Sequence, residues 1–478
     1  MSTIEVITEW EKNNKLFEIG KVKNFDFYAY LRRELVNTIV NLKNNIPVDP
    51  LKTAGQTDTG VKLFVKLLKR TEKPPKKNVD LLILCHPRRN KVGEVYESVF
   101  TDFLEEEFPN SVTLERMYDN HVHFEPSLTK NICYTDRITL KSYVYRILKS
   151  KFCKKEYASV KNEIRSIVEG PFKEIEQILD IELDVKAYVE RGVMLYYFCK
   201  SRKKDFEKFL DKVNPKAVAE VVPKSVDAML INEICRERGI KVVELQHSLL
   251  GPIAIYPDGI YEKQAPQYFL SYSDYWSDYQ KYAIPKENVI SCGSAFFERQ
   301  VKQYKKDGNA SGKKKILFIS AAAYGNELSR VAVELKRACG DKFEIIYKLH
   351  PNEFSIWKDS YPELIREEIN VVDSKDVSIY EFFNDAYAQV GVFSTALYEA
   401  LAFDVKTFIL DIPFAAEFRD FCKEGYGTLI NNGNELYQYL SDETFSAESL
   451  SVAEISEKFW KSDARKNVVE QINRILDL

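Results

Sequence analysis

The chain has 478 residues, too many for one core of ordinary size and enough for two domains. Its 69 basic and 72 acidic residues leave a net charge of -3, which argues against a general attraction to nucleic acid. The eight cysteines form no C-x-x-C pair and no cluster with histidine at metal-ligand spacing, so we expect reduced thiols and no bound metal. The first residues do not resemble a signal peptide and no run reaches ~20 apolar residues, so we expect a cytoplasmic protein.

The first half of the sequence predicts helices followed by a parallel sheet. Residues 1–75 form an expected N-terminal helical segment, because "FDFYAYLRRELVNTIVNL" repeats apolar residues at helical spacing. A first domain is expected over 76–285, beginning with "VDLLILCHP", a continuous apolar run typical of a central parallel strand. Residues 138–213 are helical in pattern and highly charged, which predicts a helical insertion. The segments "PKAVAEVVP", "VDAMLINEICRERG" and "IKVVELQHS" then predict a β-α-β unit.

The second half repeats the alternation of strands and helices. A second domain is expected over 286–450, with strands such as "KKKILFISA", "FEIIYKLHP", "AQVGVF" and "KTFILD". A C-terminal helix is expected over 451–478. This order predicts the α/β fold class, with two Rossmann-like doubly wound parallel sheets in tandem.

Polar residues gather where the predicted strands end. Ligands of open parallel sheets bind outside these carboxyl ends, so such residues are the candidates for a site. They are Cys85, His86, Arg88 and Arg89; Glu115, Asp119, His121 and His123; Gln246 and His247; Gly293 and Ser294; Lys348, His350 and Pro351; and Ser394 and Thr395. A lone histidine after a strand is more often a loop residue than a catalyst. His350 is the exception, because "KLHP" faces a second candidate anion site in the same predicted domain.

That second site is the start of the helix expected at "STALYEALA". Ser394 and Thr395 open the helix, whose free N–H groups and positive dipole end favour a phosphate. The plain alternative is an ordinary N-cap, a position that Ser and Thr favour anyway. Glu399 lies about one and a half turns further on and can reach the ribose hydroxyls of a nucleotide; its alternative is a solvated helix surface. Imidazole, helix start and carboxylate together indicate a nucleotide site.

At this point the sequence resembles a known group of enzymes. "YKLHPNEF" with "VFSTALYEAL" is similar to the His-Pro and Ser/Thr motifs of bacterial sialyltransferases, polysialyltransferases and Kdo transferases, which are GT-B glycosyltransferases with CMP-activated sugars. Related patterns occur in CDP-glycerol transferases. "KVVELQHSLLGPIAIY" resembles a segment of surface-polysaccharide transferases, with Ser248 where glycine is usual. The resemblance covers roughly residues 215 to 415. "ALAFDVKTFIL" lacks the Gly and Pro found in UDP-sugar enzymes, which argues against a UDP-hexose donor.

The resemblance implies a role for each candidate residue. His350 would contact the donor phosphate and assist departure of CMP, and Lys348, Pro351, Ser394, Thr395, Glu399, Gly293 and Ser294 would bind the nucleotide. The acceptor hydroxyl needs a base from the first domain, for which His247 leads and Glu115, Asp119, His121 and His123 are alternatives. Arg88, Arg89 and Gln246 would bind the acceptor, although the two arginines are equally expected as solvated loop residues. No metal or other cofactor is implied.

The implied function is the metal-independent, inverting transfer of an acidic sugar from CMP to a capsule or lipopolysaccharide acceptor. The alternatives are a CDP-polyol phosphotransferase, a UDP-sugar glycosyltransferase, a sugar-nucleotide epimerase and a nucleotide-binding scaffold without activity. Partners would be a nucleotide-sugar and a glycan or glycolipid, and not nucleic acid. The aromatic and basic segment "LYYFCKSRKK" (195–204) suggests peripheral binding to the inner membrane, while its alternative is a helix with one charged face.

Overall fold

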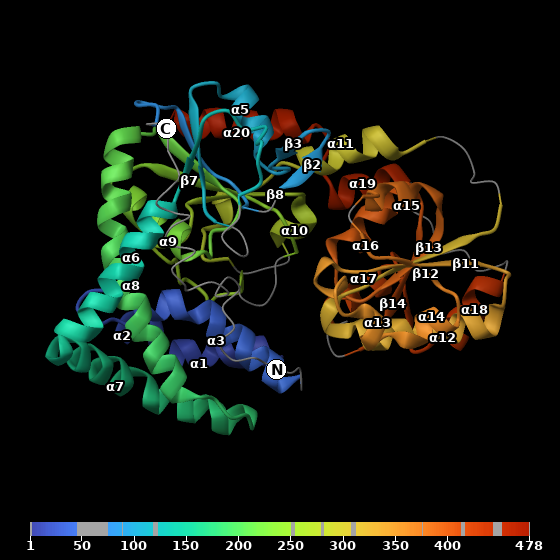
Figure 1. Ribbon diagram of the computed structural model, residues 1–478, viewed down its shortest axis with the longest axis horizontal. Helices are drawn as coiled ribbons and strands as arrows, with labels where there is room; N and C mark the ends of the chain where they lie inside the picture. The colour runs from blue at the N-terminus through green and yellow to red at the C-terminus, as the bar shows by residue number, and fades with distance from the viewer. Residues whose placement is uncertain are drawn as a thin grey trace. The chain divides into compact units, whose positions relative to one another are not determined.

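A computed structural model describes residues 2–44, 75–87, 89–117, 123–249, 254–278, 282–306, 312–374, 376–412, 416–442 and 452–477. The chain divides into two compact units (Figure 1). The first unit comprises Met1–Gly293 and Ala464–Leu478, and the second comprises Ser294–Asp463. Each unit is built around one parallel sheet with helices on both faces, so each is described separately below.

The first unit contains a seven-stranded sheet in the order β5-β4-β1-β6-β7-β8-β9. Every pairing in it is parallel. The chain therefore starts in the middle, grows toward one edge, and then returns to add strands on the other side of β1. The strands are β1 (Leu81–Leu84), β4 (Ser111–Glu115), β5 (Ile132–Tyr134), β6 (Ala217–Glu220), β7 (Lys241–Leu245), β8 (Tyr268–Ser271) and β9 (Val289–Ser291).

Helices cover both faces of this sheet. On one face α5 (Asp102–Glu107) and α20 (Ala464–Leu476) pack against β1, β6 and β7 in a common apolar core. Toward the other side lie α9 (Val226–Glu237), α8 and α3 in successive contact. The remaining elements are α1 (Thr3–Asn13), α2 (Leu16–Ile19), α3 (Phe27–Lys43), α6 (Asp136–Phe152), α7 (Lys154–Leu179), α8 (Val185–Val213), α10 (Asp274–Asp278), η3 (Lys286–Asn288) and a hairpin of β2 (Asn90–Val92) and β3 (Val95–Glu97).

The second unit contains a six-stranded parallel sheet in the order β12-β11-β10-β13-β14-β15. Its strands are β10 (Lys315–Ile319), β11 (Glu344–Lys348), β12 (Asn370–Val372), β13 (Ala386–Gly391), β14 (Lys406–Leu410) and β15 (Thr428–Ile430). The inner strands are buried on both faces, which explains why they read as continuous apolar runs. The direction of growth reverses between β10 and β13, as it does between β1 and β6 in the first unit.

Two layers of helices enclose the second sheet (Figure 1). Helices α12 (Gly325–Cys339), α14 (Pro362–Arg366) and α18 (Gly433–Ser441) share one apolar core with the strands. The other helical elements are α11 (Ala295–Tyr304), α13 (Trp357–Ser360), α15 (Ile379–Asp385), α16 (Thr395–Glu399), α17 (Ala416–Lys423), α19 (Val452–Phe459), η4 (Ala322–Tyr324), η5 (Pro351–Glu353) and η6 (Ala400–Phe403).

The predicted fold class of two Rossmann-like parallel sheets is confirmed, and two boundaries need correction. β9 pairs with β8, so the first unit extends through Gly293, beyond the expected limit at residue 285. The expected C-terminal helix over 451–478 is two helices, and only α19 stays in the second unit. Helix α20 returns to the first unit because Val468, Ile472 and Ile475 complete its core. The helical insertion expected over 138–213 consists of α6, α7 and α8.

No helix in the described ranges has both the length and the apolar character needed to cross a bilayer. The segment 195–204, which suggested a membrane contact, lies inside α8. Leu195, Tyr196, Tyr197 and Cys199 are buried there. These side chains belong to the core and are not available for a membrane contact.

Candidate functional site

Three polar strand exits come together in the second unit at the reversal of strand order. Ser320 follows β10, His350 follows β11 and Ser394 follows β13, and β10 lies between the other two strands. With ~4.8 Å between neighbouring strands, β11 and β13 are roughly 10 Å apart. Ligands of open α/β sheets bind at this kind of reversal point, outside the carboxyl ends of the strands.

The turn at His350 fixes which ring nitrogen carries the proton. His350 is the N-cap of η5, and the backbone N–H of Asn352 donates to His350 Nδ1 over 3.2 Å. Because a backbone N–H is only a donor, Nδ1 accepts and the neutral imidazole carries its hydrogen on Nε2. Pro351 occupies the first position of η5, where its fixed φ suits the helix start. The ring therefore holds Nε2–H as a hydrogen-bond donor.

The buried carboxylate of Glu353 stabilises this turn through hydrogen bonds. Glu353 is fully buried, and its Oε2 accepts from the His350 backbone N–H over 2.7 Å. Its Oε1 accepts from Ser320 Oγ over 2.8 Å and from the Tyr361 hydroxyl over 2.7 Å. A side chain at Gly325 would collide with this group, since a Cβ there would lie 2.4 Å from Glu353 Oε1. Glu353 thus ties the exit of β10 to the exit of β11.

The other side of the reversal point is the start of α16. Ser394 is the N-cap, and its Oγ accepts from the backbone N–H of Ala396 over 3.2 Å. Thr395 is the first residue of the helix and is half-buried. Glu399 ends α16, and its Oε2 accepts from the Tyr380 hydroxyl over 2.9 Å. Burial raises the pKa of Glu399 to about 7, an effect that the Tyr380 hydrogen bond partly offsets.

Lys348 is the last residue of β11, and its side chain is turned toward the end of β12. Its Nζ donates to the Ser374 carbonyl over 3.1 Å. Burial lowers the pKa of Lys348, and Asp376 partly compensates. Lys348 and His350 are both half-buried while Leu349 between them is buried, as the alternation of side chains along a strand requires.

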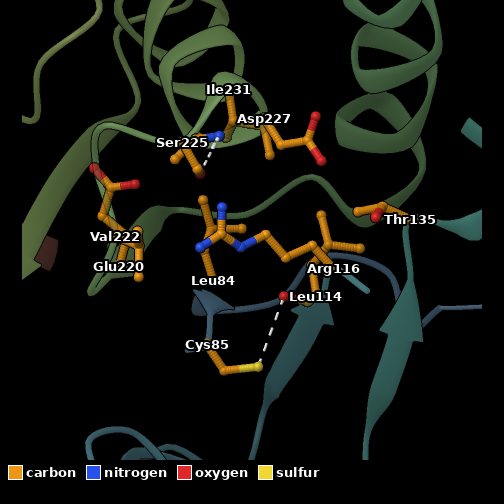
Figure 2. A pocket seen from close by; sticks show the side chains of 11 residues that line it. Leu84, Cys85, Leu114, Arg116, Thr135, Glu220, Val222, Ser225, Asp227 and Ile231 are labelled. Carbon is orange, nitrogen blue, oxygen red and sulfur yellow. Dashed lines mark hydrogen bonds between the residues drawn. The ribbon is translucent and has the colours of Figure 1, made fainter. Parts of the chain in front are cut away.

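A pocket lies at the reversal point of the first unit (Figure 2). It contains about 330 Å³ of space, a volume that includes space open to solvent. The ends of β1, β4, β5 and β6 and the start of α9 supply the lining. These residues are Leu84, Cys85, Leu114, Arg116, Thr135, Glu220, Val222, Ser225, Asp227, Ala228 and Ile231.

Arg116 reaches across the middle of this pocket, with Glu220 on one side of it and Thr135 on the other in Figure 2. Burial lowers the pKa of Arg116; Asp227 partly offsets this, and Arg33 and Arg202 add repulsion. Burial also raises the pKa of Glu220 to about 7, against weaker lowering by Asn232, Lys224 and Arg116.

His247, the leading candidate for the base, follows β7 in the same unit. Burial lowers the pKa of His247 to about 3, and the positive charges of His86, Arg33 and Arg116 add to the effect. The rings of His86 and His247 lie 5.7 Å apart. A group with so low a pKa takes up a proton poorly near neutral pH, so the electrostatics of His247 do not favour a general base.

Two residues that were expected to bind the acceptor, Arg89 and Gln246, instead form buried hydrogen bonds within the first unit. Arg89 has a fully buried side chain and donates to Glu115 Oε2 over 2.6 Å and to Thr129 Oγ1 over 2.9 Å. It is neither a solvated loop residue nor directed to a ligand, because the carboxylate that ends β4 draws it inward. The buried Gln246 accepts from the Tyr272 backbone N–H over 2.8 Å and donates to the Ser248 carbonyl.

The alternative bases Glu115 and His123 belong to the same buried network. His123 Nδ1 lies 2.6 Å from Glu115 Oε1, and its Nε2 lies 2.9 Å from Asp136 Oδ1. Burial lowers the pKa of His123, but hydrogen bonds and charge from Asp136 and Glu115 outweigh it and the net shift is upward. An imidazole held between two carboxylates by both of its ring nitrogens has a structural role.

The other predicted residues lie elsewhere. Arg88, Asp119 and His121 are outside the described residues. Gly293 ends the first unit with a φ of 92°, a conformation that favours glycine, and Ser294 caps α11 at the start of the second unit. Within the described ranges, His, Cys, Asp and Glu side chains form no group of three or more that would hold a metal ion.

The sequence reasoning overlooked Arg116, Thr135, Glu220 and Glu353. Glu220 had a signal, because a carboxylate inside the apolar run "AVAEVV" predicts a buried charge. Glu353 also had one, since it stands three residues after His350 in the spacing of a capping box. Arg116 and Thr135 each follow a strand, but only the pairing of β4 with β1 and β5 shows that they line one pocket.

No protein-family model matches the chain, and no curated protein sequence matches it. Among solved structures, a putative UDP-N-acetylglucosamine 2-epimerase from Listeria monocytogenes matches with a TM-score of 0.50 at 10% identity, over 84% of this chain and 97% of that chain. The chain has the GT-B type of fold, with two Rossmann-like domains in tandem. At this identity the likeness shows the fold alone.

Two further solved structures match at lower scores. The wall teichoic acid polymerase TagF matches with a TM-score of 0.45 at 10% identity, over 95% of this chain and 99% of that chain. A UDP-GlcNAc 2-epimerase from Neisseria meningitidis, bound to UDP-GlcNAc, matches with a TM-score of 0.47 at 11% identity, over 82% of this chain and 99% of that chain. Neither likeness carries an argument about activity.

Proposed function

We propose that the protein is a GT-B glycosyltransferase that transfers a sugar from a nucleotide-activated donor to a surface glycan, with a CMP-activated acidic sugar as the leading donor. The donor preference rests on the resemblance of "YKLHPNEF" and "VFSTALYEAL" to CMP-sugar enzymes. In this proposal the donor phosphate lies between the exits of β11 and β13. Ser394 and Thr395 hold it from the start of α16, and no metal takes part.

The observation that carries the proposal is the state of His350. Its Nδ1 accepts from Asn352 N–H, so its neutral ring carries the proton on Nε2. A neutral donor at a strand exit beside the reversal point suits an oxyanion, and in this reaction it supports the phosphate of the leaving CMP. Glu353 holds the turn through the His350 backbone, so the ring is positioned before the donor binds.

The test is nucleotide binding followed by thermal unfolding. CMP, CDP, UDP and GDP are added to the full chain with EDTA or with Mg²⁺. At one hundred times its dissociation constant a ligand stabilises by roughly 2.7 kcal/mol. We expect CMP to raise the melting temperature in EDTA. His350→Asn should abolish that rise, because asparagine still caps η5 but lacks a donor at the Nε2 position.

Ser394→Ala and Ser378→Ala form a matched pair for the other side of the site. Both serines are N-caps of short helices in the second unit, and Ser378 Oγ accepts from the Tyr380 backbone N–H as Ser394 Oγ does from that of Ala396. We expect only Ser394→Ala to weaken CMP binding. Equal loss in both variants would show that capping alone is responsible and would remove Ser394 from the proposal.

A sugar-nucleotide epimerase is the second candidate, because the solved structure with the TM-score of 0.50 is a putative UDP-N-acetylglucosamine 2-epimerase. The same experiment separates the two. Stabilisation by UDP and not by CMP, together with conversion of UDP-GlcNAc in the absence of an acceptor, would replace the glycosyltransferase proposal. Stabilisation by CDP alone would favour a CDP-polyol phosphotransferase.

A lipid-linked acceptor would bring the protein to a membrane, and α6 supports this part of the proposal. This helix carries four exposed apolar side chains at helical spacing: Val144, Ile147, Leu148 and Phe152. The exposed fraction of Phe152 is 79%. Lys151, Lys154 and Lys155 flank Phe152, are exposed, and form no ion pair with another described residue. Apolar side chains beside free lysines suit a surface of anionic lipid.

A further inference from the structure

The pocket of the first unit contains polar groups that the protein itself leaves unsatisfied. Glu220 is fully buried, and its Oε1 accepts from Asn232 Nδ2 over 2.8 Å. Its Oε2 and the hydroxyl of Thr135, a residue only 2% exposed, have no hydrogen-bond partner among the described residues. A buried polar atom without a partner destabilises the fold, so two of them on one pocket indicate a ligand.

Arg116 adds a cation to the same pocket. Its guanidinium is half-buried and makes no hydrogen bond or ion pair with any residue that the structure describes. Asp227, whose charge partly offsets the lowering of the Arg116 pKa by burial, is engaged instead by Arg202, which also donates to Thr139 Oγ1 and Ser142 Oγ. The five N–H donors of the planar guanidinium therefore face a pocket with two acidic groups. One of them, Asp227, is already paired with Arg202, and burial raises the pKa of the other, Glu220, to about 7.

The backbone around the pocket also favours an anion. The pocket lies where the strand order reverses between β1 and β6, and α9 begins there. α9 is twelve residues long, and its cap Ser225 accepts from the Ala228 backbone N–H. The positive end of its dipole is therefore directed at the same space as Arg116.

We propose that this pocket binds a small hydroxylated anion, such as a sugar acid or a sugar phosphate. Arg116 pairs with the oxyanion, and Glu220 Oε2 and Thr135 Oγ1 form hydrogen bonds with hydroxyl groups of the ligand. Arg238 at the opposite end of α9 has no such role, because it pairs with Asp211 on the surface. That this ligand is the acceptor rests on the proposed function, whereas binding itself does not.

The experiment uses three sugars with one ring and different charges. Glucose, glucuronate and glucose 6-phosphate are titrated into the full chain by calorimetry, with no nucleotide present, and inorganic phosphate serves as an anion without a ring. We expect glucuronate or glucose 6-phosphate to bind at least tenfold more tightly than glucose. The stronger of the two identifies carboxylate or phosphate as the oxyanion.

Variants assign the contacts. Arg116→Gln should reduce the preference for the charged sugar at least tenfold, Arg116→Lys should restore part of it, and Arg238→Gln should leave it unchanged. Glu220→Gln and Thr135→Val should instead reduce the advantage of glucose 6-phosphate over inorganic phosphate. Circular dichroism and thermal unfolding check that each variant is folded.

Two results would overturn the proposal: a charge preference that survives in folded Arg116→Gln, or no binding of any charged sugar to the wild-type chain. Neither depends on nucleotide binding through His350 and Ser394. A failure of this proposal is therefore distinguishable from a failure of the proposed function.

Discussion

At the scale of single residues, the first unit buries carboxyl groups that have too few partners. Glu220 and Glu244 are neighbours across β6 and β7, and both are buried. Burial raises the pKa of both groups, and the charge of Glu220 adds to the shift at Glu244. Burying two neighbouring carboxyl groups lowers the free energy of unfolding. Groups with such shifted pKa values are typical of functional sites.

This arrangement predicts a pH-dependent stability that Glu220→Gln removes. The pKa of Glu220 rises from an ordinary 4.5 to about 7 in the folded state. Between these values the folded state holds a proton that the unfolded state has released, so the free energy of unfolding falls as pH rises. The full difference is roughly 3 kcal/mol. Urea unfolding at a series of pH values should show a shallower decline in the variant.

The contrary result is easy to recognise. If wild type and Glu220→Gln lose stability in parallel between pH 4.5 and 7, the carboxyl group is not protonated in the folded state and its pKa is not raised. Glu399, whose pKa burial also raises to about 7, contributes equally to both curves and does not affect the comparison.

Residues of this kind also mark the limit of what the sequence predicts. His350 and Ser394 were recognised because each lies within three residues of the end of a strand with a clear apolar pattern. Arg89 and Arg116 both follow strands too, yet one is buried in an ion pair and the other faces a pocket. That difference depends on which strand lies beside which, information that no local pattern contains.

At the scale of elements, strands with a long apolar run were predictable, whereas two short edge strands were missed. β10, β11 and β14 each have five residues with an apolar run, and all were predicted. β5 and β15 have three residues each and lie at sheet edges, where periodicity has too little length to appear. One edge of each sheet, β5 and β15, therefore came from the structure, whereas the centres, which carry the candidate sites, were predicted from the sequence.

Helix α6 gives a prediction at this scale. Phe152→Ser should weaken binding to vesicles of anionic phosphatidylglycerol about tenfold or more, because burying a phenylalanine contributes ~1.5–3 kcal/mol. Flotation of the protein with vesicles measures the bound fraction. Ile178→Ser is the matched control, since Ile178 is also exposed, at 52%, but lies near the acidic Glu174 and Asp180.

Further arms of the vesicle experiment test the chemistry. Binding should fall at high salt, which screens Lys151, Lys154 and Lys155. Vesicles of phosphatidylcholine alone should bind less. Equal weakening by Phe152→Ser and Ile178→Ser would mean that α6 is not the contact, and absence of binding to either lipid would leave the α6 surface to a protein partner instead.

At the scale of the whole molecule, the C-terminal residues of the chain belong to the first unit, not to the second. Helix α20 follows a complete second unit, yet Val468, Ile472 and Ile475 fill the core formed by β1, β6, β7 and α5. Folding of the first unit therefore needs residues from both ends of the chain. The contacts involved are distant in sequence, and their closure costs entropy that the buried apolar surface must offset.

Ile472→Ala tests this dependence. Removing a fully buried isoleucine from a packed core costs 2–5 kcal/mol, so the first unit should open more often. Hydrogen exchange followed by mass spectrometry should show faster exchange in β1, β6 and β7, whereas Asn473→Ala on the exposed side of α20 should have little effect. β10 and β13 serve as the internal reference. Unchanged exchange in β1 with Ile472→Ala would mean that the first unit closes its core without α20, and that the C-terminal return is dispensable for its fold.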